Sequence, residues 1–288
     1  MKKIIILGAK GFIGKNLCEF FDNQEKYTVS PLSRVDVDFT DIESLTEKIK
    51  DISPNYIIHS AVSLDNFENN IRMFYALENV ASLLEKIILI GSGAEYISAR
   101  YKPLMKENYF PNEPVYPVDI YTLSKYTISK LLSISNTKNI YNLRVFGIYG
   151  PYEDFQRRLI SNNLVRHLNN LPLQYNRNVA FDYLYINDFL SALERFLSLE
   201  KPKYNTYNLC VGKAYKFKEI METIADVVGE DTSDIILNDS NPSNYEYSGD
   251  PTLIENEIGK IEQTKLLDAI TKLYSWYKNQ DLTSLTLN

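Results

Sequence analysis

In the first half of the chain, short runs of apolar residues alternate with longer segments in which apolar residues recur every three or four positions. The short runs predict buried strands, and the longer segments predict amphipathic helices. The expected strands are Lys3–Leu7, Thr28–Leu32, Tyr56–His59, Lys86–Gly91 and Ile140–Val145, and the expected helices are Phe12–Phe21, Ile42–Ile49, Asn70–Leu84 and Tyr121–Ile134. Strands that are apolar throughout and separated by helices are typical of a doubly wound α/β fold with a parallel sheet and right-handed crossovers.

The pattern changes after Gly150-Pro151, where the loops lengthen and short strands mix with helices. We expect a smaller mixed α/β lobe over residues 151–288, following a first domain over residues 1–150. Residues 181–199 are expected to pack back onto the first domain. The elements expected after residue 150 are Leu159–Leu168, Tyr183–Ile186, Phe189–Leu199, Tyr207–Cys210, Phe217–Val228 and Gln263–Trp276.

Composition and charge exclude several classes of protein. The 288 residues carry a formal net charge of −6, which argues against nucleic acid or an anionic membrane as the main partner. No stretch reaches the roughly 20 apolar residues of a membrane helix. The apolar run near the start is too short for a signal peptide, so a cytoplasmic protein is expected. The two cysteines and two histidines match no metal spacing, and no metal site is expected.

The segment Gly8–Gly14 has glycines at every third position, after an expected strand and at the start of an expected helix. This context predicts a dinucleotide-binding loop. Gly8 permits the tight turn, Gly11 lets the backbone approach a pyrophosphate, and Gly14 lets helix and strand pack closely. The first domain is therefore expected to be a Rossmann-type dinucleotide-binding domain, and the second lobe is expected to bind the substrate. The alternative is a structural turn without a ligand.

The end of the second expected strand bears on the choice between NAD and NADP. An enzyme that uses NAD usually carries an acidic residue here, about 20 residues after the glycines, for the ribose 2′-hydroxyl. This chain reads Leu32-Ser33-Arg34, and a guanidinium group can pair with a 2′-phosphate. The residues favour NADP(H), with NAD(H) possible if Arg34 is only a solvated loop residue. Asp38 and Phe39 are candidates to border the adenine, while Asp41 can equally cap the next helix.

Tyr121 and Lys125 lie four residues apart on an expected helix, so both side chains project from one face. An ammonium group close to a phenol favours the phenolate and lowers its pKa from about 10. Tyr121 is thus a candidate proton donor or acceptor for an alcohol–ketone pair. Ser92 follows the expected strand Lys86–Gly91, at the sheet edge where such folds bind ligands, and can hydrogen-bond the reacting oxygen. The alternatives are a solvated helix stripe and a turn serine.

Several strings occur in the order typical of one protein family: Gly8–Gly14, Ile57–Ala61, Ser92–Tyr96, Tyr121–Lys125, Leu143–Pro151, Phe181–Asp188, Tyr207–Cys210 and Gly249-Asp250. With them the chain resembles the extended short-chain dehydrogenase/reductases, a family of NAD(P)-dependent nucleotide-sugar epimerases, dehydratases and reductases. The similarity covers nearly the whole chain, and it is specific for the family but not for one member.

The resemblance implies a catalytic triad of Ser92, Tyr121 and Lys125 and a nucleotide-diphosphate-sugar substrate in the second lobe. It also implies a homodimer formed through two helices near residues 66–85 and 118–134. His59 lies near the cofactor in this family, although a purely structural role is equally open. The expected cofactor-binding residues are Gly8, Lys10, Gly11, Phe12, Ile13, Gly14, Ser33, Arg34, Asp38, Phe39, Ser60, Ala61, Tyr121, Lys125 and Phe146.

Departures from the family's patterns narrow the reaction. The 4,6-dehydratases carry an Asp-Glu pair directly after the serine or threonine, where this chain has Gly93 and Ala94, which hold no titratable group. Glu95 comes one residue too late and points the other way on an extended backbone. Members that invert C3 and C5 need a cysteine and a histidine, at positions that are Ala94 and Arg158 here. Neither dehydration nor that double epimerisation is therefore expected.

Arginines of the second lobe are the candidates for binding a diphosphate. Many family members place an arginine directly before the aspartate of the 181–188 string, where this chain has Phe181. Arg177, four residues earlier, and Arg158 are expected to take this role, with surface arginines as the alternative. Arg144 is expected to be structural. The remaining expected substrate contacts are Ser92, Gly93 and Ala94.

These residues favour an NADPH-dependent enzyme that reduces the 4-keto group of a nucleotide-diphosphate-linked deoxysugar, supplying activated sugars for cell-surface polysaccharide. A 4-epimerase that retains NAD needs the same residues and is the first alternative. A non-catalytic dinucleotide sensor is the second, although a sensor has no use for Ser92, Tyr121 and Lys125 together.

Overall fold

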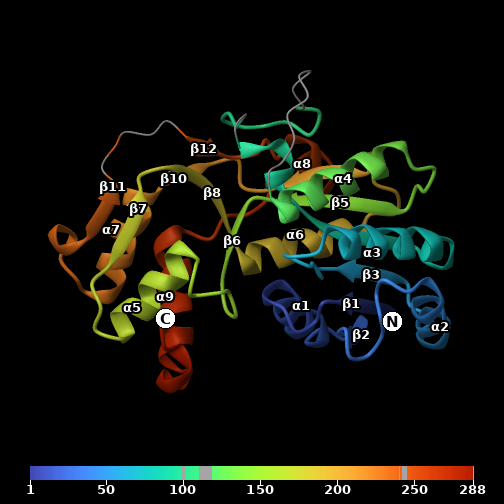
Figure 1. Cartoon of the computed structure of the whole chain (residues 1–288), viewed down its shortest axis with the longest axis horizontal. Coiled ribbons are helices and arrows are strands. Elements are labelled where there is room, and N and C mark those ends of the chain that lie inside the picture. Colours follow the sequence, from blue (N-terminus) through green and yellow to red (C-terminus); the bar gives the residue numbers. More distant parts are fainter. Residues whose placement is uncertain (99–100, 110–118, 240, 242–244, 288) are drawn as a thin grey trace.

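The computed structural model describes residues 1–98, 101–109, 119–239, 241 and 245–287, which form a sheet-based domain and a smaller lobe (Figure 1). The domain is built on a parallel six-stranded sheet with the order β2-β1-β3-β4-β5-β9. Its strands are β1 (Lys2–Leu7), β2 (Tyr27–Leu32), β3 (Tyr56–His59), β4 (Lys86–Ser92), β5 (Ile140–Val145) and β9 (Thr206–Leu209). The order reverses between β1 and β3, and a doubly wound sheet binds its ligand at such a switch point. The predicted Rossmann-type fold is confirmed.

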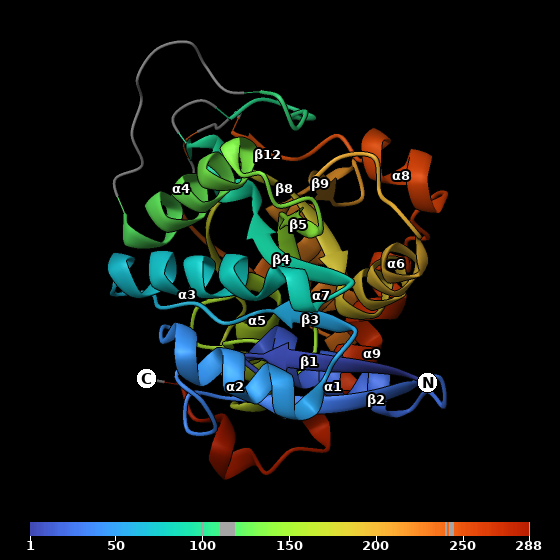
Figure 2. The same ribbon diagram turned by 90° about the vertical axis from the view of Figure 1, so that its right-hand side faces the viewer.

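The sheet is buried on both faces, which explains the continuous apolar runs of its strands. In β1, Ile4 and Ile6 pack into one core layer. Ile5 and Leu7 pack into the other. Figure 2 shows the three helices of the second layer along one side of the sheet. The first layer is covered by α1 (Phe12–Asp22) and α6 (Ile186–Ser198), and the second by α2 (Ile42–Ile52), α3 (Phe67–Val80) and α4 (Ile120–Ile134).

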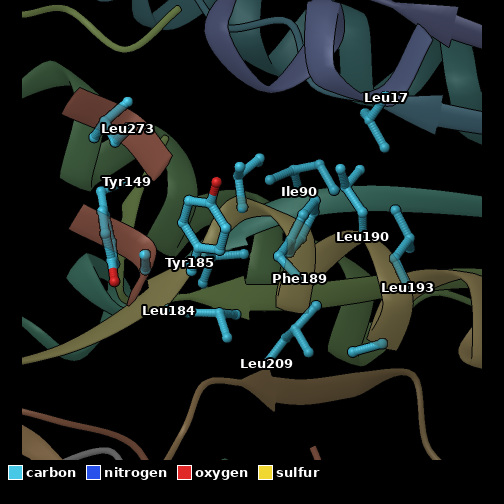
Figure 3. Packing of buried hydrophobic residues seen from close by; sticks show 14 of the residues in the cluster. Leu17, Ile90, Tyr149, Leu184, Tyr185, Phe189, Leu190, Leu193, Leu209 and Leu273 are labelled. Atoms are coloured by element: carbon cyan, nitrogen blue, oxygen red, sulfur yellow. The ribbon is translucent and has the colours of Figure 1, made fainter. Parts of the chain in front are cut away.

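One strand that we expected in the second lobe belongs to the first domain. β9 pairs in parallel with β5, with Asn142 opposite Thr206, so the strand expected at Tyr207–Cys210 forms an edge of the main sheet. α6 also packs on this domain, and Figure 3 shows its Leu190 close to Leu17 of α1. A local apolar pattern identifies a strand but carries no information on which sheet it joins.

The second lobe combines short strands with helices that pack on one another. Its central strand, β8, pairs with β10, β12 and β6, and β7 pairs with β11. Apart from β8 these strands were not expected, because strands of two to four residues are too short to show a clear alternation. The elements are β6 (Gly147–Tyr149), α5 (Leu159–Leu168), β7 (Gln174–Arg177), β8 (Ala180–Tyr185), β10 (Ala214–Lys216), α7 (Phe217–Val228), β11 (Ile236–Asp239), β12 (Glu246–Tyr247) and α9 (Leu266–Lys278), with α8 (Thr252–Ile258) packed against β9 and α6.

Two further features complete the fold. Short 3₁₀ turns lie at η1 (Ala81–Leu83), η2 (Gly93–Tyr96), η4 (Thr232–Asp234) and η5 (Leu282–Leu285). An aromatic cluster joins domain and lobe beyond the carboxyl ends of β4 and β5, where Tyr96 and Phe146 meet Tyr247.

None of the helices in the described part of the chain has the length and apolar character needed to cross a membrane.

Candidate active site

The loop between β1 and α1 leaves no room for side chains at two of its glycines. Gly8 has a φ of +87°, and a Cβ atom there would lie 2.7 Å from the backbone nitrogen of Ala61. A Cβ atom on Gly14 would lie 2.1 Å from the carbonyl oxygen of Gly8. Gly11 differs, because its Cβ position meets only that oxygen, at 3.4 Å. Gly11 therefore faces open space from which a phosphate group can approach the backbone.

The start of α1 suits an anion. Gly11 precedes this helix, no side chain caps it, and no acidic residue lies in its first turn. By contrast, the side chains of Asp41, Asn66 and Asp119 cap α2, α3 and α4. Free N–H groups at the start of a helix, together with the helix dipole, bind phosphate. The glycine loop and α1 therefore fit the pyrophosphate of a dinucleotide.

The end of β2 lies beside the loop that follows β3. Arg34 is exposed and donates a hydrogen bond from Nη2 to the carbonyl oxygen of Val62 at 3.1 Å. The backbone N–H and the hydroxyl of Ser33 both donate to Asp36 at 2.7 Å. These bonds hold the pKa of Asp36 below its usual range, and the charge of Lys10 acts in the same direction. Asp36 is thus a fixed anion next to Arg34, and we did not predict it.

Two side chains that we expected to border the adenine are engaged in contacts within the protein. Phe39 packs into the core with an exposed fraction of 2%, so its ring cannot stack on a base. Asp38 accepts two hydrogen bonds from Thr40, which closes its own turn. Phe12 and Ile13 are half-buried against the core. The Phe39 ring is thus turned away from solvent, and the expectation that Asp38 and Phe39 border the adenine stays a prediction.

The carboxyl end of β3 packs against the glycine loop. Ser60 donates from its hydroxyl to the carbonyl oxygen of Leu7 at 2.9 Å. His59, at the strand end, is buried, and its Nδ1 has no hydrogen-bond partner in the part of the chain described. Burial lowers the pKa of His59 to about 3, with the charge of Lys125 acting in the same direction. The imidazole is therefore neutral, and it lies near Lys125.

Ser92 and Tyr121 come together at the carboxyl end of β4. Ser92 is the last residue of that strand, and its hydroxyl accepts a hydrogen bond from the N–H of Ala94 at 3.1 Å. Tyr121 lies in the first turn of α4. Burial raises the pKa of Tyr121, while the Ser92 hydroxyl and the guanidinium group of Arg158 act in the opposite direction. The Ser92 hydroxyl and the positive charge of Arg158 therefore both favour the ionised form of the phenol.

Lys125 is buried beside this pair. Its Nζ donates to the carbonyl oxygen of Ile90 at 2.6 Å and lies 5.9 Å from the centre of the Tyr121 ring. Burial lowers the pKa of Lys125 to about 8, and the charge of Glu95 opposes that change. We expected Lys125 to lower the pKa of Tyr121 below its ordinary value. In the protein burial dominates and raises that pKa, because little water reaches the phenol.

Glu95 and Arg144 form a buried ion pair next to Ser92, 2.6 Å apart. Arg144 also donates to the hydroxyls of Tyr96 and Ser129, and the N–H of Ser92 donates to Glu95 at 3.3 Å. Glu95 is thus turned away from the cleft, and Arg144 has the structural role expected of it. A matched buried pair of this kind holds the backbone at Ser92 in place.

An aromatic wall stands directly over Gly93. A Cβ atom on this residue would lie 2.6 Å from the ring of Phe146 and 2.7 Å from the hydroxyl oxygen of Tyr247. The rings of Phe146 and Tyr247 are 4.9 Å apart. The position after Ser92 therefore has no space for an acidic side chain. We did not predict Tyr247, whose only sequence signal is its place just before Gly249-Asp250.

The two candidate arginines of the second lobe have different surroundings. Arg158 precedes α5 and borders a cleft with Phe181 and Tyr183, and its charge acts on Tyr121. Arg177 is exposed on β7, pairs with Asp239 at 3.1 Å and borders an adjoining hollow. The charge of Arg158 therefore acts on Tyr121, whereas Arg177 is paired with Asp239.

The sheet, the glycine loop and the residues around Tyr121 define a dinucleotide-dependent enzyme of the extended short-chain type. The chain belongs to the NAD dependent epimerase/dehydratase family, whose model matches residues 4–210. The cofactor class is accordingly a nicotinamide dinucleotide.

Among curated proteins, the chain is similar to GDP-6-deoxy-D-talose 4-dehydrogenase of Aggregatibacter actinomycetemcomitans, with 24% identity over 96% of this chain and 98% of that protein. It is also similar to dTDP-4-dehydrorhamnose reductase of the same organism, with 27% identity over 72% of this chain and 73% of that protein. The crystal structure of dTDP-glucose 4,6-dehydratase from Bacillus anthracis in complex with NAD has the same fold. Its TM-score is 0.82 at 17% identity, over 99% of this chain and 100% of that one.

Proposed function

We propose that the protein is an NADPH-dependent reductase of the 4-keto group of a nucleotide-diphosphate-linked deoxysugar. The observation that carries this proposal is the grouping of Ser92, Tyr121 and Lys125 at the carboxyl end of β4, where Gly93 leaves no space for an acid. Such a site can exchange a hydride and a proton at one carbon, but it lacks the extra acid–base groups that dehydration needs. The similarity to two enzymes named for 4-keto or 4-hydroxy sugars supports this assignment.

In the proposed reaction, reduced nicotinamide supplies the hydride. Tyr121 donates its phenolic proton to the carbonyl oxygen, which becomes the new hydroxyl. Ser92 donates a hydrogen bond to the same oxygen and polarises the carbonyl. Lys125, with its charge buried near the phenol, stabilises the phenolate that remains. Arg158 is proposed to bind the diphosphate of the substrate, because its planar guanidinium group is a donor suited to phosphate oxygens.

The test is incubation of the purified protein with NADPH and a panel of nucleotide-linked 4-keto-6-deoxysugars. Loss of nicotinamide absorbance is followed together with the mass of the sugar product. The proposal expects one NADPH consumed for each sugar that gains two hydrogen atoms. If no sugar of the panel consumes NADPH, the reductase assignment is wrong.

The preference for NADPH rests on Arg34, at the end of β2. Replacing it in Arg34→Ala is expected to raise the KM for NADPH about tenfold and to leave the KM for NADH nearly unchanged, since one charge-assisted contact to the 2′-phosphate is lost. Steady-state kinetics with both cofactors measure this ratio. An equal change for both cofactors would show that Arg34 does not select the phosphate.

A 4-epimerase is the second candidate, favoured by one observation. Arg34 already donates to the carbonyl oxygen of Val62, and the fixed carboxylate of Asp36 lies nearby and can accept from a ribose hydroxyl. Both features suit NAD. An epimerase would co-purify with NAD and isomerise an ordinary nucleotide sugar without net redox change.

We further propose a homodimer formed through α3 and α4, which lie against each other. Residue 118, at the start of the second expected dimer segment, lies outside the described residues. Exposed apolar side chains on and beside these helices support the interface: Tyr75 at 46%, Leu83 at 47%, Ile120 at 38% and Ile134 at 79%. Sedimentation equilibrium of the wild type and of Tyr75→Asp tests it, and a dimer is expected only for the former.

A further inference from the structure

The Ser92 hydroxyl has few positions left for new hydrogen bonds. A serine hydroxyl can donate one hydrogen bond and accept two. One acceptor position of Ser92 is taken by the N–H of Ala94, at 3.1 Å. The backbone cannot turn away, because the N–H of Ser92 donates to the buried Glu95 at 3.3 Å. One acceptor position and one donor therefore remain.

Tyr247 approaches this hydroxyl from the second lobe. It lies on β12, opposite Phe181 of β8, and its ring is buried against Phe146 and Tyr101, with both centroid distances 4.9 Å. Its hydroxyl oxygen would lie 2.7 Å from a Cβ atom on Gly93, the residue next to Ser92. The Tyr247 hydroxyl therefore lies against the serine loop, one residue along the chain from Ser92.

The surroundings of Tyr247 favour its protonated form. Burial raises the pKa of Tyr247 well above its ordinary value, the neighbouring phenols of Tyr101 and Tyr121 act in the same direction, and Ser92 opposes them. The phenol therefore has a hydrogen to donate. A buried O–H group needs an acceptor, and Ser92 has one position free.

We propose that Tyr247 is a positioning residue that donates its hydroxyl hydrogen to Ser92 and so directs the hydroxyls of Ser92 and Tyr121 towards the substrate. With both acceptor positions of Ser92 occupied, Ser92 cannot accept from Tyr121. The Tyr121 proton is then left for the substrate's carbonyl oxygen, and the Ser92 hydrogen points to that oxygen or to Tyr121. The inference rests on the proposed function in one respect, that the reacting sugar oxygen lies beside Tyr121.

The same contact accounts for glycine at position 93. A side chain there would meet both the Phe146 ring and the Tyr247 hydroxyl, so the approach of Tyr247 and an acid at this position exclude each other. The chain thus has a neutral donor from the second lobe where the family's dehydratases carry an acid on the serine loop.

The first experiment is a cycle of four proteins: wild type, Tyr247→Phe, Ser92→Ala and the double variant. Tyr247→Phe keeps the ring in its aromatic packing and removes only the hydroxyl. In the protein that keeps Ser92, we expect Tyr247→Phe to lower kcat about tenfold, which corresponds to the loss of one hydrogen bond, and to change KM by less than about twofold. In the Ser92→Ala background the same change is expected to have almost no further effect, because the acceptor is gone.

Tyr245→Phe is the matched control, since it removes another phenol oxygen from the same lobe, beside Tyr101 and Phe181. It is expected to leave kcat and KM unchanged. An equal loss for Tyr247→Phe in both backgrounds would overturn the proposal, because the hydroxyl would then act without Ser92. Unchanged kcat in the Ser92 background would overturn it as well.

A second readout needs no substrate. Ultraviolet titration of each protein against its Tyr121→Phe counterpart isolates the ionisation of Tyr121. Without the hydroxyl of Tyr247, Ser92 is free to accept a hydrogen bond from Tyr121, which stabilises the protonated phenol. The ionisation of Tyr121 is therefore expected to move to higher pH in Tyr247→Phe and not in Tyr245→Phe. An unmoved titration contradicts the proposal. If the wild type reduces no keto sugar, the proposed function fails while this titration still decides the role of Tyr247.

Discussion

The loop proposed to hold the pyrophosphate is one continuous segment, Gly8–Gly14, whereas the substrate side is assembled from segments far apart in the chain. On the cofactor side the absence of side chains creates the binding surface, because any Cβ on Gly8 or Gly14 would strike the backbone. On the substrate side bulky or charged groups create it, among them Phe146 and Tyr247. Adding a side chain should therefore disrupt the cofactor side, whereas removing side-chain atoms should disrupt the substrate side.

The two parts of the molecule also treat buried acids differently. Glu95, in the first domain, faces Arg144 at 2.6 Å and shares a full set of hydrogen bonds. Glu153, at the border of the second lobe, is 5% exposed and has the Ser161 hydroxyl at 2.5 Å as its hydrogen-bond partner. Burial raises the pKa of Glu153 to about 8, while Ser161 and the charge of Arg158 oppose that change. The charge of Glu95 is thus balanced by the buried cation of Arg144, whereas the surroundings of Glu153 favour its protonated, neutral form.

The largest effect is expected where the two sides meet, at Tyr121. Tyr121→Phe should lower kcat about 1000-fold, since general acid catalysis contributes roughly 10²–10⁴-fold, and should leave the Kd for NADPH within about twofold. Steady-state kinetics measure kcat, and fluorescence titration measures the Kd for NADPH. Tyr126→Phe, on the same helix, is the control and should retain activity. More than a tenth of the wild-type kcat in Tyr121→Phe would remove Tyr121 from the chemistry.

Next in size is the response of the cofactor side to one added methyl group. Gly11→Ala should weaken NADPH binding about 10- to 100-fold while changing the Tm little, because the new Cβ meets the ligand and not the protein. Gly14→Ala should lower both, since its Cβ would lie 2.1 Å from the Gly8 oxygen. Calorimetry of binding and of unfolding separates the two. Normal NADPH affinity in Gly11→Ala would place the pyrophosphate elsewhere.

The substrate side is tested by removing charge. Arg158→Met should raise the KM for the nucleotide sugar about tenfold, the size of one charge-assisted contact, while Arg177→Met should change it less than about twofold. The difference follows from Arg177 being paired with Asp239 away from Tyr121. Steady-state kinetics at saturating NADPH decide between them. Equal effects would mean that the substrate reaches both hollows.

The smallest effect concerns stability and pH. The pKa of Glu153 is about 8 in the folded chain against an ordinary 4.5, so the folded state binds more protons between these values, and its contribution to stability falls as pH rises through this range. Glu153→Gln carries no such charge, so its stability should fall less than that of the wild type between pH 5 and pH 8. Urea unfolding at pH 5 and pH 8 measures this. The exposed control Glu47→Gln should show no pH-dependent gain, and a similar gain there would contradict the assignment.

Where local chemistry decides structure, prediction from sequence succeeds. β3 and β5 have the bounds that their apolar runs predicted, and the glycines of the first loop have the geometry that their spacing indicated. Prediction failed where distant segments decide. β9 joins the main sheet, and the pKa of Tyr121 follows its burial more than its neighbouring lysine.

The sequence alone determined the fold class and the family, and it predicted the dinucleotide loop and the Ser92–Tyr121–Lys125 triad, because each depends on residues close in the chain or on strings in a set order. The tertiary structure alone decided what surrounds them. It brought Tyr247 against Gly93, separated Arg158 from Arg177, and buried Tyr121. The physical reason is that burial and contact across the cleft depend on how β8, β9 and β12 return to the first domain, and those crossings leave no periodic signal in the chain.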